Sequence, residues 1–312
     1  MSIEKAEIIE VTDKIYLHRY TGTRFNEGNI SCINMKWGLI FIDAGARMDK
    51  AAEFRKQMEQ KFQKSSKILV LTHTDGDHIQ GMDAFADLQV IVSESGMQKM
   101  VEDEREGAFK KEFRQNQIDK IIKGAEERKD PLPDAWMNDF APRFIKAKFF
   151  LPNISFKNQM YIRDNTQTLT LTLIQGHTPC SILIEYRSSE DNSQKILFTG
   201  DNLNAEHADN SGCMLGRSME SLKQIKHIID SDFNVFVPGH GPVVDKEYAI
   251  KTLAYLTEMK SRINQLIAEN LSKEAIITHP SLPVFYETKV PDFLPRVISL
   301  WYDYFNSDPK SV

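Results

Sequence analysis

Cysteine is scarce in this sequence, with only Cys32, Cys180 and Cys213 among 312 residues. The number is odd and no two cysteines form a CxxC pair, which argues against a disulfide scaffold and favours a reducing compartment. No apolar run approaches the roughly 20 residues that a membrane-spanning helix requires. The first residues, MSIEKAEIIEV, lack the basic and apolar segments of a secretory signal. We therefore expect a cytoplasmic protein.

Charge of one sign is also lacking. The 39 basic and 44 acidic residues give a net charge of −5, which argues against a broad nucleic-acid interface. One basic cluster has acidic neighbours, which favour a solvated helical face. Its members are Arg105, Lys110, Lys111, Arg114, Lys120 and Lys123. Repeats and low-complexity segments are absent, and a chain of this length can bury a core without disulfides or a structural metal.

Segments with strand and helix patterns alternate in both halves of the chain. Alternating or short apolar runs predict strands at 7–11, 15–18, 30–35, 39–42, 68–71, 90–92, within 149–163, and at 168–175, 181–186, 195–198 and 235–237. Apolar residues at helical spacing predict helices at 50–64, 81–85, 247–271 and 293–305. This order predicts a mixed α/β layered fold with sheets inside and helices outside.

We expect a single domain over residues 1–312, with a helical insertion at about 94–147 and a helical extension at about 246–312. The insertion is either a solvated helical hairpin or a wall of the substrate site. Aromatic residues of the insertion and the extension either line a pocket or belong to the core; these are Trp136, Phe140, Tyr286 and Trp301.

Four predicted strands lead directly into residues that bind metals. The segments are THTDGDHIQG (72–81), GHTPCS (176–181), TGD (199–201) and PGHGP (238–242). Each residue alone fits a turn, a helix cap or a surface position. Together they offer imidazole and carboxylate groups at strand ends, where a rigid sheet positions side chains, and divalent metals bind both groups. The candidate ligands are His73, Asp75, Asp77, His78, His177, Asp201 and His240.

At these residues the sequence resembles the metallo-β-lactamase fold superfamily. That family's signature is T-H-x-H-x-D-H-x-x-G, followed by a His, by an Asp after a strand, and by a His in a G-H-G-like turn. GNISCIN (28–34) and LIFIDAG (39–45) also resemble the family, and the resemblance extends over about residues 7–245. It implies a four-layer αββα sandwich of two mixed β-sheets with outer helices and a dinuclear metal site at one edge.

The resemblance also implies a role for each ligand. His73 and His177 would hold the first of two divalent metal ions, with zinc the first expectation. The second ion would be held by Asp77, His78 and His240, and Asp201 would bridge the two. Asp77 and Asp201 are the candidate catalytic residues, beside a hydroxide between the metals. Asp43 matches a position that steadies the motif loop (residues 72–81), as metal sites generally require.

One residue departs from the family pattern, because Asp75 stands where the signature has its second His. With Asp75, Asp77 and Asp201 ionised, the ligands carry three negative charges instead of two, which weakens the Lewis acidity of the metals. Oxygen ligands also favour iron or manganese, and the diiron branch of the superfamily resembles this sequence in having an acidic residue there. Alternatively, Asp75 does not bind and one site is filled.

The leading functional hypothesis is a hydrolase that uses a metal-bound hydroxide on a carbonyl substrate, namely a lactone, a thioester or a β-lactam. The alternatives are a non-haem iron oxidoreductase resembling the sulfur dioxygenases, a phosphodiesterase or nuclease, and a non-catalytic binding scaffold. The expected partner is a small-molecule substrate, with neither a membrane nor a nucleic acid; a homodimer stays open.

Overall fold

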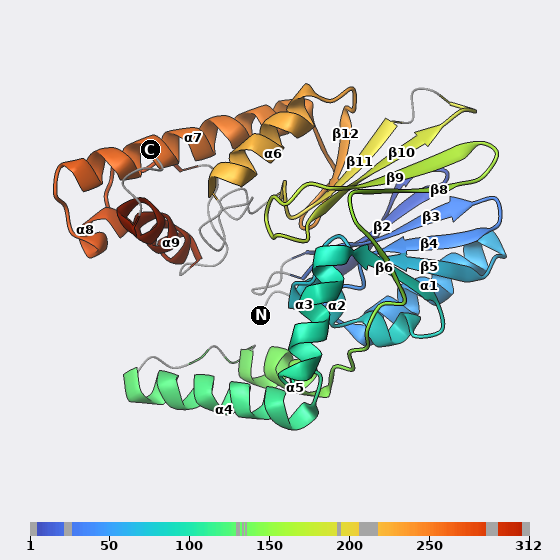
Figure 1. The fold of residues 1–312 in the computed structure, drawn as a ribbon, viewed down its shortest axis with the longest axis horizontal. Coiled ribbons are helices and arrows are strands. Elements are labelled where there is room, and N and C mark those ends of the chain that lie inside the picture. Colours follow the sequence, from blue (N-terminus) through green and yellow to red (C-terminus); the bar gives the residue numbers. More distant parts are fainter. Residues whose placement is uncertain are drawn as a thin grey trace. The chain divides into compact units, whose positions relative to one another are not determined.

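The computed structural model describes residues 5–21, 27–128, 132, 134, 136–191, 195–205, 218–284 and 293–307. The chain divides into two compact units, Met1–Asn158 and Gln159–Val312. Each unit contains one β-sheet (Figure 1). The expectation of a single domain over the whole chain stays a prediction.

The sheet of the first unit has seven strands whose order in space follows their order in the sequence. From the first strand to the fourth, each strand is antiparallel to the next. From the fourth strand to the seventh, each strand is parallel to the next. The strands are β1 (Lys5–Thr12), β2 (Ile15–Thr21), β3 (Ile30–Met35), β4 (Gly38–Ile42), β5 (Ser66–Val70), β6 (Gln89–Ser93) and β7 (Ile154–Phe156).

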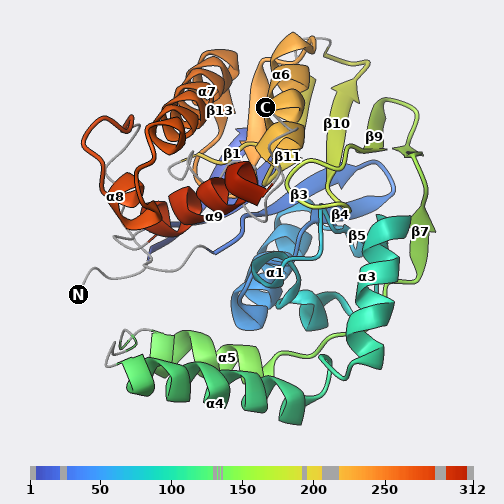
Figure 2. The same ribbon diagram turned by 60° about the vertical axis from the view of Figure 1, so that its left-hand side comes forward.

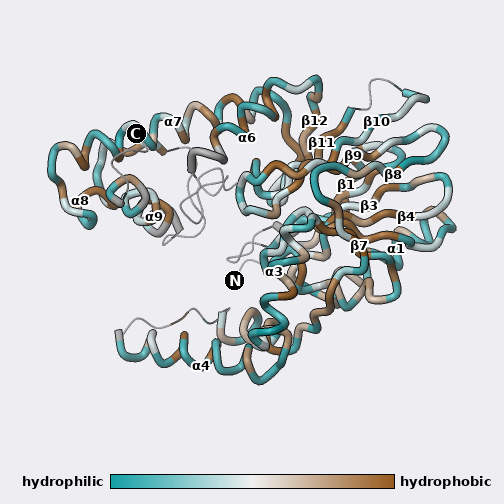
Figure 3. Tube along the Cα trace, in the orientation of Figure 1, coloured by the Kyte–Doolittle hydropathy of each residue, from teal (hydrophilic) through white to brown (hydrophobic). Residues whose placement is uncertain are grey.

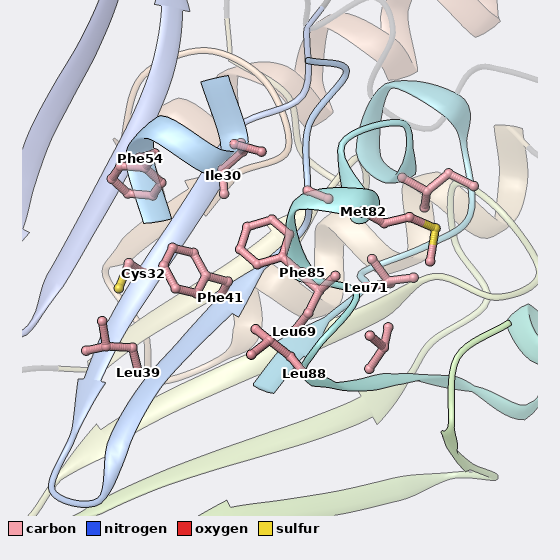
Figure 4. Close-up of a cluster of buried hydrophobic side chains, with 14 of the residues drawn as sticks. Ile30, Cys32, Leu39, Phe41, Phe54, Leu69, Leu71, Met82, Phe85 and Leu88 are labelled. Carbon is pink, nitrogen blue, oxygen red and sulfur yellow. The ribbon is translucent and has the colours of Figure 1, made fainter. Parts of the chain in front are cut away.

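The core of this unit lies between the sheet and helix α1 (Met48–Phe62). Phe54 and Met58 are one helical turn apart, so both point to the sheet, and both are buried. The ring of Phe41 on β4 packs against Phe54 and Phe85, with centroid distances of 5.8 and 5.0 Å (Figure 4). Phe85 belongs to the short 3₁₀ helix η1 (Met82–Phe85).

Residues 94–147 are largely helical, as predicted. They form α3 (Glu94–Arg105), α4 (Lys111–Arg128), the π-helical turn η2 (Trp136–Phe140) and α5 (Ala141–Lys146). Ser93 caps the N-terminus of α3, because its Oγ accepts a hydrogen bond from the Gly96 amide at 3.2 Å. Helices α4 and α5 lie side by side (Figure 2), and α4 is mostly hydrophilic (Figure 3).

Arg114 is an exception to the solvated basic face predicted for the insertion, because it is buried. Its guanidinium donates to the carbonyl oxygens of Ala108, Phe144, Ile145 and Ala147. These oxygens lie near the end of α5 and in the turn before α4, where carbonyl groups lack helical partners. Arg114 therefore fastens α4 to α5, and the prediction for this residue was wrong.

The sheet of the second unit has six strands in the order β13-β12-β11-β10-β9-β8. Strands β11 and β12 are parallel, and every other pair is antiparallel. The strands are β8 (Gln159–Arg163), β9 (Gln167–Leu173), β10 (Ile182–Ser188), β11 (Lys195–Gly200), β12 (Val235–Pro238) and β13 (Val244–Asp245).

The helices of the second unit are α6 (Ser218–Asp230), α7 (Lys246–Ala268), α8 (Lys273–Ile277) and α9 (Phe293–Ser307). One face of α7 packs with α6 and α9 around Trp301, which is 2% exposed, so this tryptophan belongs to the core. Tyr286 lies outside the described residues. Among the described helices, none is both long and apolar enough to cross a bilayer.

His18 on β2 makes the stability of the first unit depend on pH. The side chain is buried with its ring centroid 5.3 Å from that of Phe54. Burial lowers its pKa from 6.5 to about 4, with a smaller opposing effect from Glu53 and a small lowering by Lys50. The unfolded chain therefore binds this proton first, and the stability that is full above pH 6.5 falls as the pH drops towards 4.

Between pH 7.5 and pH 5, protonation of His18 in the unfolded chain should lower the free energy of unfolding by about 2 kcal/mol. We expect His18→Met to abolish this decrease. Urea unfolding at both pH values measures this. The exposed His227 on α6 supplies the control variant His227→Met. Equal pH dependence in the wild type and His18→Met would contradict the assignment.

Candidate metal centre

The loops that follow β4 and β5 are joined by main-chain hydrogen bonds. These strands are parallel neighbours, so their carboxyl ends meet at one edge of the sheet. The Asp43 amide donates to the Val70 carbonyl at 2.8 Å, and the Ala44 amide donates to the His78 carbonyl at 2.8 Å. The motif loop and helix α2 (Gly76–Ile79) are thereby fixed beside the end of β4.

Two glycines permit the close approach of this loop to its neighbours. A Cβ atom on Gly81 would lie 2.1 Å from the Ala44 carbonyl oxygen, and one on Gly28 would lie 2.7 Å from the Asp77 carbonyl oxygen. Any larger residue would therefore displace the backbone that carries the candidate ligands.

The buried carboxylate of Asp43 fixes the motif loop by hydrogen bonds to Thr72 and His78. Its Oδ1 accepts from the Thr72 amide and its Oδ2 accepts from the Thr72 hydroxyl, both at 2.7 Å. The same Oδ2 lies 2.9 Å from Nδ1 of His78. The predicted role of Asp43 in steadying the loop is confirmed.

These hydrogen bonds fix the tautomers of two histidines. A carboxylate only accepts, so Nδ1 of His78 carries the proton that it donates to Asp43. The Thr72 hydroxyl donates its only proton to Asp43. Its Oγ1, 3.0 Å from Nδ1 of His73, therefore accepts a hydrogen bond from that nitrogen. Both imidazoles therefore present an unprotonated Nε2, which is the form that binds metals.

Each of these Nε2 atoms lies beside a carboxylate of the same loop. Nε2 of His73 is 3.7 Å from Asp75 Oδ2, and Nε2 of His78 is 3.9 Å from Asp77 Oδ2. The two imidazole centroids are 4.2 Å apart. Both histidines are buried, whereas the side chains of Asp75 and Asp77 are 37% and 29% exposed. The first unit thus gathers four predicted ligands.

The second unit gathers the other three. His177 follows β9, Asp201 follows β11 and His240 follows β12, all at the same edge of the sheet. Oδ2 of Asp201 lies 3.7 Å from Nε2 of His177 and 3.2 Å from Nε2 of His240. All three side chains are at least 95% buried, so Asp201 is a buried carboxylate between two imidazoles.

Asn202 connects the loops of this second cluster, and sequence reasoning did not find it. Its Oδ1 accepts from the His177 amide at 2.9 Å, and its Nδ2 donates to the Thr199 carbonyl at 2.8 Å. The available signal was its position directly after Asp201. Gly239 also allows close approach, because a Cβ there would lie 2.0 Å from Asp201 Oδ1.

The donor atoms in both units fit divalent metal binding. Ligands at 2.0–2.2 Å from a tetrahedral ion lie about 3.3–3.6 Å apart. The four Nε2-to-carboxylate distances, 3.7, 3.9, 3.7 and 3.2 Å, lie within about 0.3 Å of this range, and each unit combines imidazole with carboxylate. Which ion each residue holds, and whether Asp75 is a ligand, stay predictions.

Four charged residues next to the motif loop form an ion network. Glu27, whose side chain is 2% exposed, lies 3.3 Å from Arg47 and 3.0 Å from Arg143. Asp139 lies 3.0 Å from Arg47 and 2.9 Å from Arg143. Glu27 precedes Gly28, which touches the motif loop, so the network attaches η2 and α5 of the insertion beside that loop.

Comparison with known proteins identifies the family and the fold. The metallo-beta-lactamase superfamily matches residues 38–240. A metallo-beta-lactamase from Pontibacter korlensis is 18% identical, with a TM-score of 0.55 over 81% of this chain and 99% of that chain. The inverting sec-alkylsulfatase Pisa1 from Pseudomonas sp. is 16% identical, with a TM-score of 0.65 over 96% of this chain and 50% of that chain.

Among curated proteins, none is significantly similar in sequence. Both of these solved structures are under 25% identical to the chain, so their likeness concerns the fold. Two mixed β-sheets with helices are the fold that the motifs predicted, and the predicted fold class is confirmed.

We expect Asp43→Asn to lower zinc affinity by about 10–100-fold, because it removes the charge that orients His73 and His78. Asn tolerates the positive φ of 58° at this position, so the backbone conformation is kept. The free energy of unfolding should fall by about 2 kcal/mol. Chelator competition and urea unfolding measure the two effects.

The control variant is Asp83→Asn, which removes a carboxylate that pairs with Lys148 at 3.2 Å. It should leave zinc affinity unchanged. If the Asp43→Asn variant bound zinc as tightly as the wild type, the Asp43 carboxylate would not orient the ligands.

Proposed function

Because the chain belongs to the metallo-β-lactamase superfamily, we propose that it is a metal-dependent hydrolase of a carbonyl substrate, namely a lactone, a thioester or a β-lactam. The observation that carries the proposal is the pairing of each imidazole Nε2 with a carboxylate oxygen at 3.2–3.9 Å. Bound divalent ions supply an activated water and a Lewis acid for the carbonyl oxygen.

The proposed ligand sets follow the family signature. His73 and His177, with Asp75, hold one ion. Asp77, His78 and His240 hold the other, and Asp201 serves both. Oδ2 of Asp201, 3.2 Å from Nε2 of His240, is our candidate acceptor for the proton of the attacking water. Asp77 is the second candidate for proton transfer, because its carboxylate is the more open of the two.

Charge favours a carbonyl substrate over a phosphodiester. Three carboxylates balance most of the four positive charges of two divalent ions, so the centre attracts the negatively charged phosphate of a diester only weakly. Of the basic residues in the insertion, Arg114 is occupied by main-chain carbonyls. The sequence also lacks a run of lysine and arginine residues long enough to bind along a nucleic-acid backbone.

Asp75 favours a second candidate, a non-haem iron oxidoreductase. A carboxylate in place of an imidazole shifts metal preference towards iron and manganese. Zinc remains our first assignment, because the other donors include four imidazoles. Metal content distinguishes the two functions.

We infer that the protein works in the cytoplasm on a small molecule. The described cysteines, Cys32 and Cys180, are both buried, and they form no disulfide with each other. Burial raises the pKa of the Cys32 thiol well above its usual range, with a smaller effect from Glu59, so this thiol is unreactive. Cys213 lies outside the described residues.

Metal analysis of the protein purified without added metal tests the proposal. We expect about two zinc ions per chain by mass spectrometry, as a dinuclear hydrolase of this ligand type requires. Asp75→His should keep that stoichiometry. Iron in the wild type, or one ion that becomes two in the variant, would show that Asp75 sets the metal chemistry. No metal under any loading condition would exclude both enzyme functions.

Hydrolysis of lactones, thioesters and β-lactams by the metal-loaded protein tests the reaction itself. We expect one class to be turned over, and Asp201→Asn to lower kcat by at least about 10²-fold, because the proton acceptor is lost. The matched control is Asp232→Asn, since Asp232 pairs on the surface with Arg187 and Lys195. Equal rates in both variants would contradict the assignment to Asp201.

A further inference from the structure

Arg143, in helix α5 of the insertion, is bound to two segments outside the insertion. Its Nη2 donates to Oε1 of Glu27, and its Nη1 donates to the Ala46 carbonyl oxygen, both at 3.0 Å. Asp139, four residues earlier, accepts from Nε and Nη2 at 2.9 Å each, and this two-point contact fixes the plane of the guanidinium. One side chain therefore ties the insertion to segments that are 116 and 97 residues away in the sequence.

Glu27 begins the first of these segments, and its charge requires cationic partners. Its side chain is 2% exposed, and its Oε1 lies within 3.3 Å of two guanidinium groups, one of them that of Arg143. A carboxylate this deeply buried is costly unless it is paired. The next residue, Gly28, lies against the motif loop. A Cβ atom there would lie 2.7 Å from the Asp77 carbonyl oxygen and 3.1 Å from Cε1 of His78. A shift of Glu27 would therefore move the backbone that touches both candidate ligands.

The second segment runs from Ala44 to Ala46 and is hydrogen-bonded to the same loop. The Ala44 amide donates to the His78 carbonyl at 2.8 Å, and the Gly81 amide donates to the Gly45 carbonyl at 2.9 Å. These main-chain hydrogen bonds connect the segment to both ends of the stretch that contains helix α2. A displacement of the segment is thereby transmitted to the helix that carries two candidate ligands.

A different arginine holds the helices of the insertion to each other. Arg114 donates to main-chain carbonyl oxygens within residues 108–147, and so joins α4 to α5. Arg143 instead directs Nη1 and Nη2 to Ala46 and Glu27 outside the insertion. Loss of Arg143 should therefore loosen the insertion from the rest of the unit while its helices stay folded.

We propose that Arg143 is a positioning residue of the candidate metal centre. By holding Glu27 and Ala46, it keeps both segments against the motif loop, and so keeps Asp77 and His78 where a divalent ion can bind them. Metal affinity then depends on the docking of the insertion, and by thermodynamic reciprocity a bound ion strengthens that docking by the same factor. The inference rests on the metal binding of the proposed function and not on its hydrolase reaction.

Chelator competition measures the effect on metal binding. We expect Arg143→Met to lower zinc affinity by at least about tenfold, as loss of a residue that supports metal ligands usually does.

The matched control is Arg55→Met. Like Arg143, Arg55 binds two carboxylates and one main-chain carbonyl oxygen, those of Glu59, Asp87 and Ala84. The two arginine side chains are 17% and 18% exposed, so both variants should lose similar stability. Because Arg55 joins α1 to residues 84–87 and not to the two segments described above, Arg55→Met should keep wild-type zinc affinity.

Hydrogen exchange of the full chain tests the reciprocal effect, first in the wild type without any substitution. Zinc should slow amide exchange in residues 136–146 of the insertion as well as in the motif loop. The slowing at 136–146 should disappear in Arg143→Met and persist in Arg55→Met. Asp139→Asn is a milder change, because its carboxylate is 32% exposed, and it should lower zinc affinity in the same direction if Arg143→Met does not fold.

Equal zinc affinity in Arg143→Met and Arg55→Met would overturn the proposal, as would exchange at 136–146 that does not respond to zinc in the wild type. A wild-type protein that binds no divalent metal would overturn this inference together with the metal centre. Coupling between zinc and the insertion in a protein that hydrolyses none of the tested substrates would support Arg143 as a positioning residue and contradict the hydrolase function alone.

Discussion

The carboxylate of Asp43 is the contact on which the candidate metal centre of the first unit depends. It accepts the proton of the Thr72 hydroxyl and that of Nδ1 of His78. Thr72 can then accept from Nδ1 of His73. One buried negative charge therefore orients two imidazoles in the tautomer that binds metal. Asp43 holds this position at a positive φ, which Asp adopts more readily than most residues.

The sequence predicted the fold well, and the positions of the candidate ligands at strand ends follow from the same local rules. Apolar runs mark strands, and a ligand directly after a strand must lie at the strand's carboxyl end. Strands β4 and β5 are parallel neighbours, as are β11 and β12, so residues that follow them gather at one edge of each sheet. This is why Asp43 lies beside the motif loop, and why Asp201 and His240 meet.

Contacts between distant segments were not predictable in this way. Arg114 looked like part of a solvated face, because nothing in its neighbourhood indicates that it caps carbonyl groups some 30 residues away. Glu27 and Arg143 are separated by 116 residues, and neither sequence context identifies the other as a partner. Asn202 was missed because one asparagine after a strand fits many loops. Such contacts depend on three-dimensional packing, which periodicity does not encode.

The position of Asp75 explains how the motif can accept a carboxylate in place of a histidine. An imidazole that binds a metal through one nitrogen generally donates the proton of its other nitrogen to a partner, as Thr72 and Asp43 accept it from His73 and His78. A carboxylate presents acceptor oxygens on both sides and needs no such partner. Asp75 is also the most exposed carboxylate of the cluster, so water can solvate the oxygen that faces away from His73. The substitution therefore changes the charge of the centre while leaving the orientation of its histidines intact.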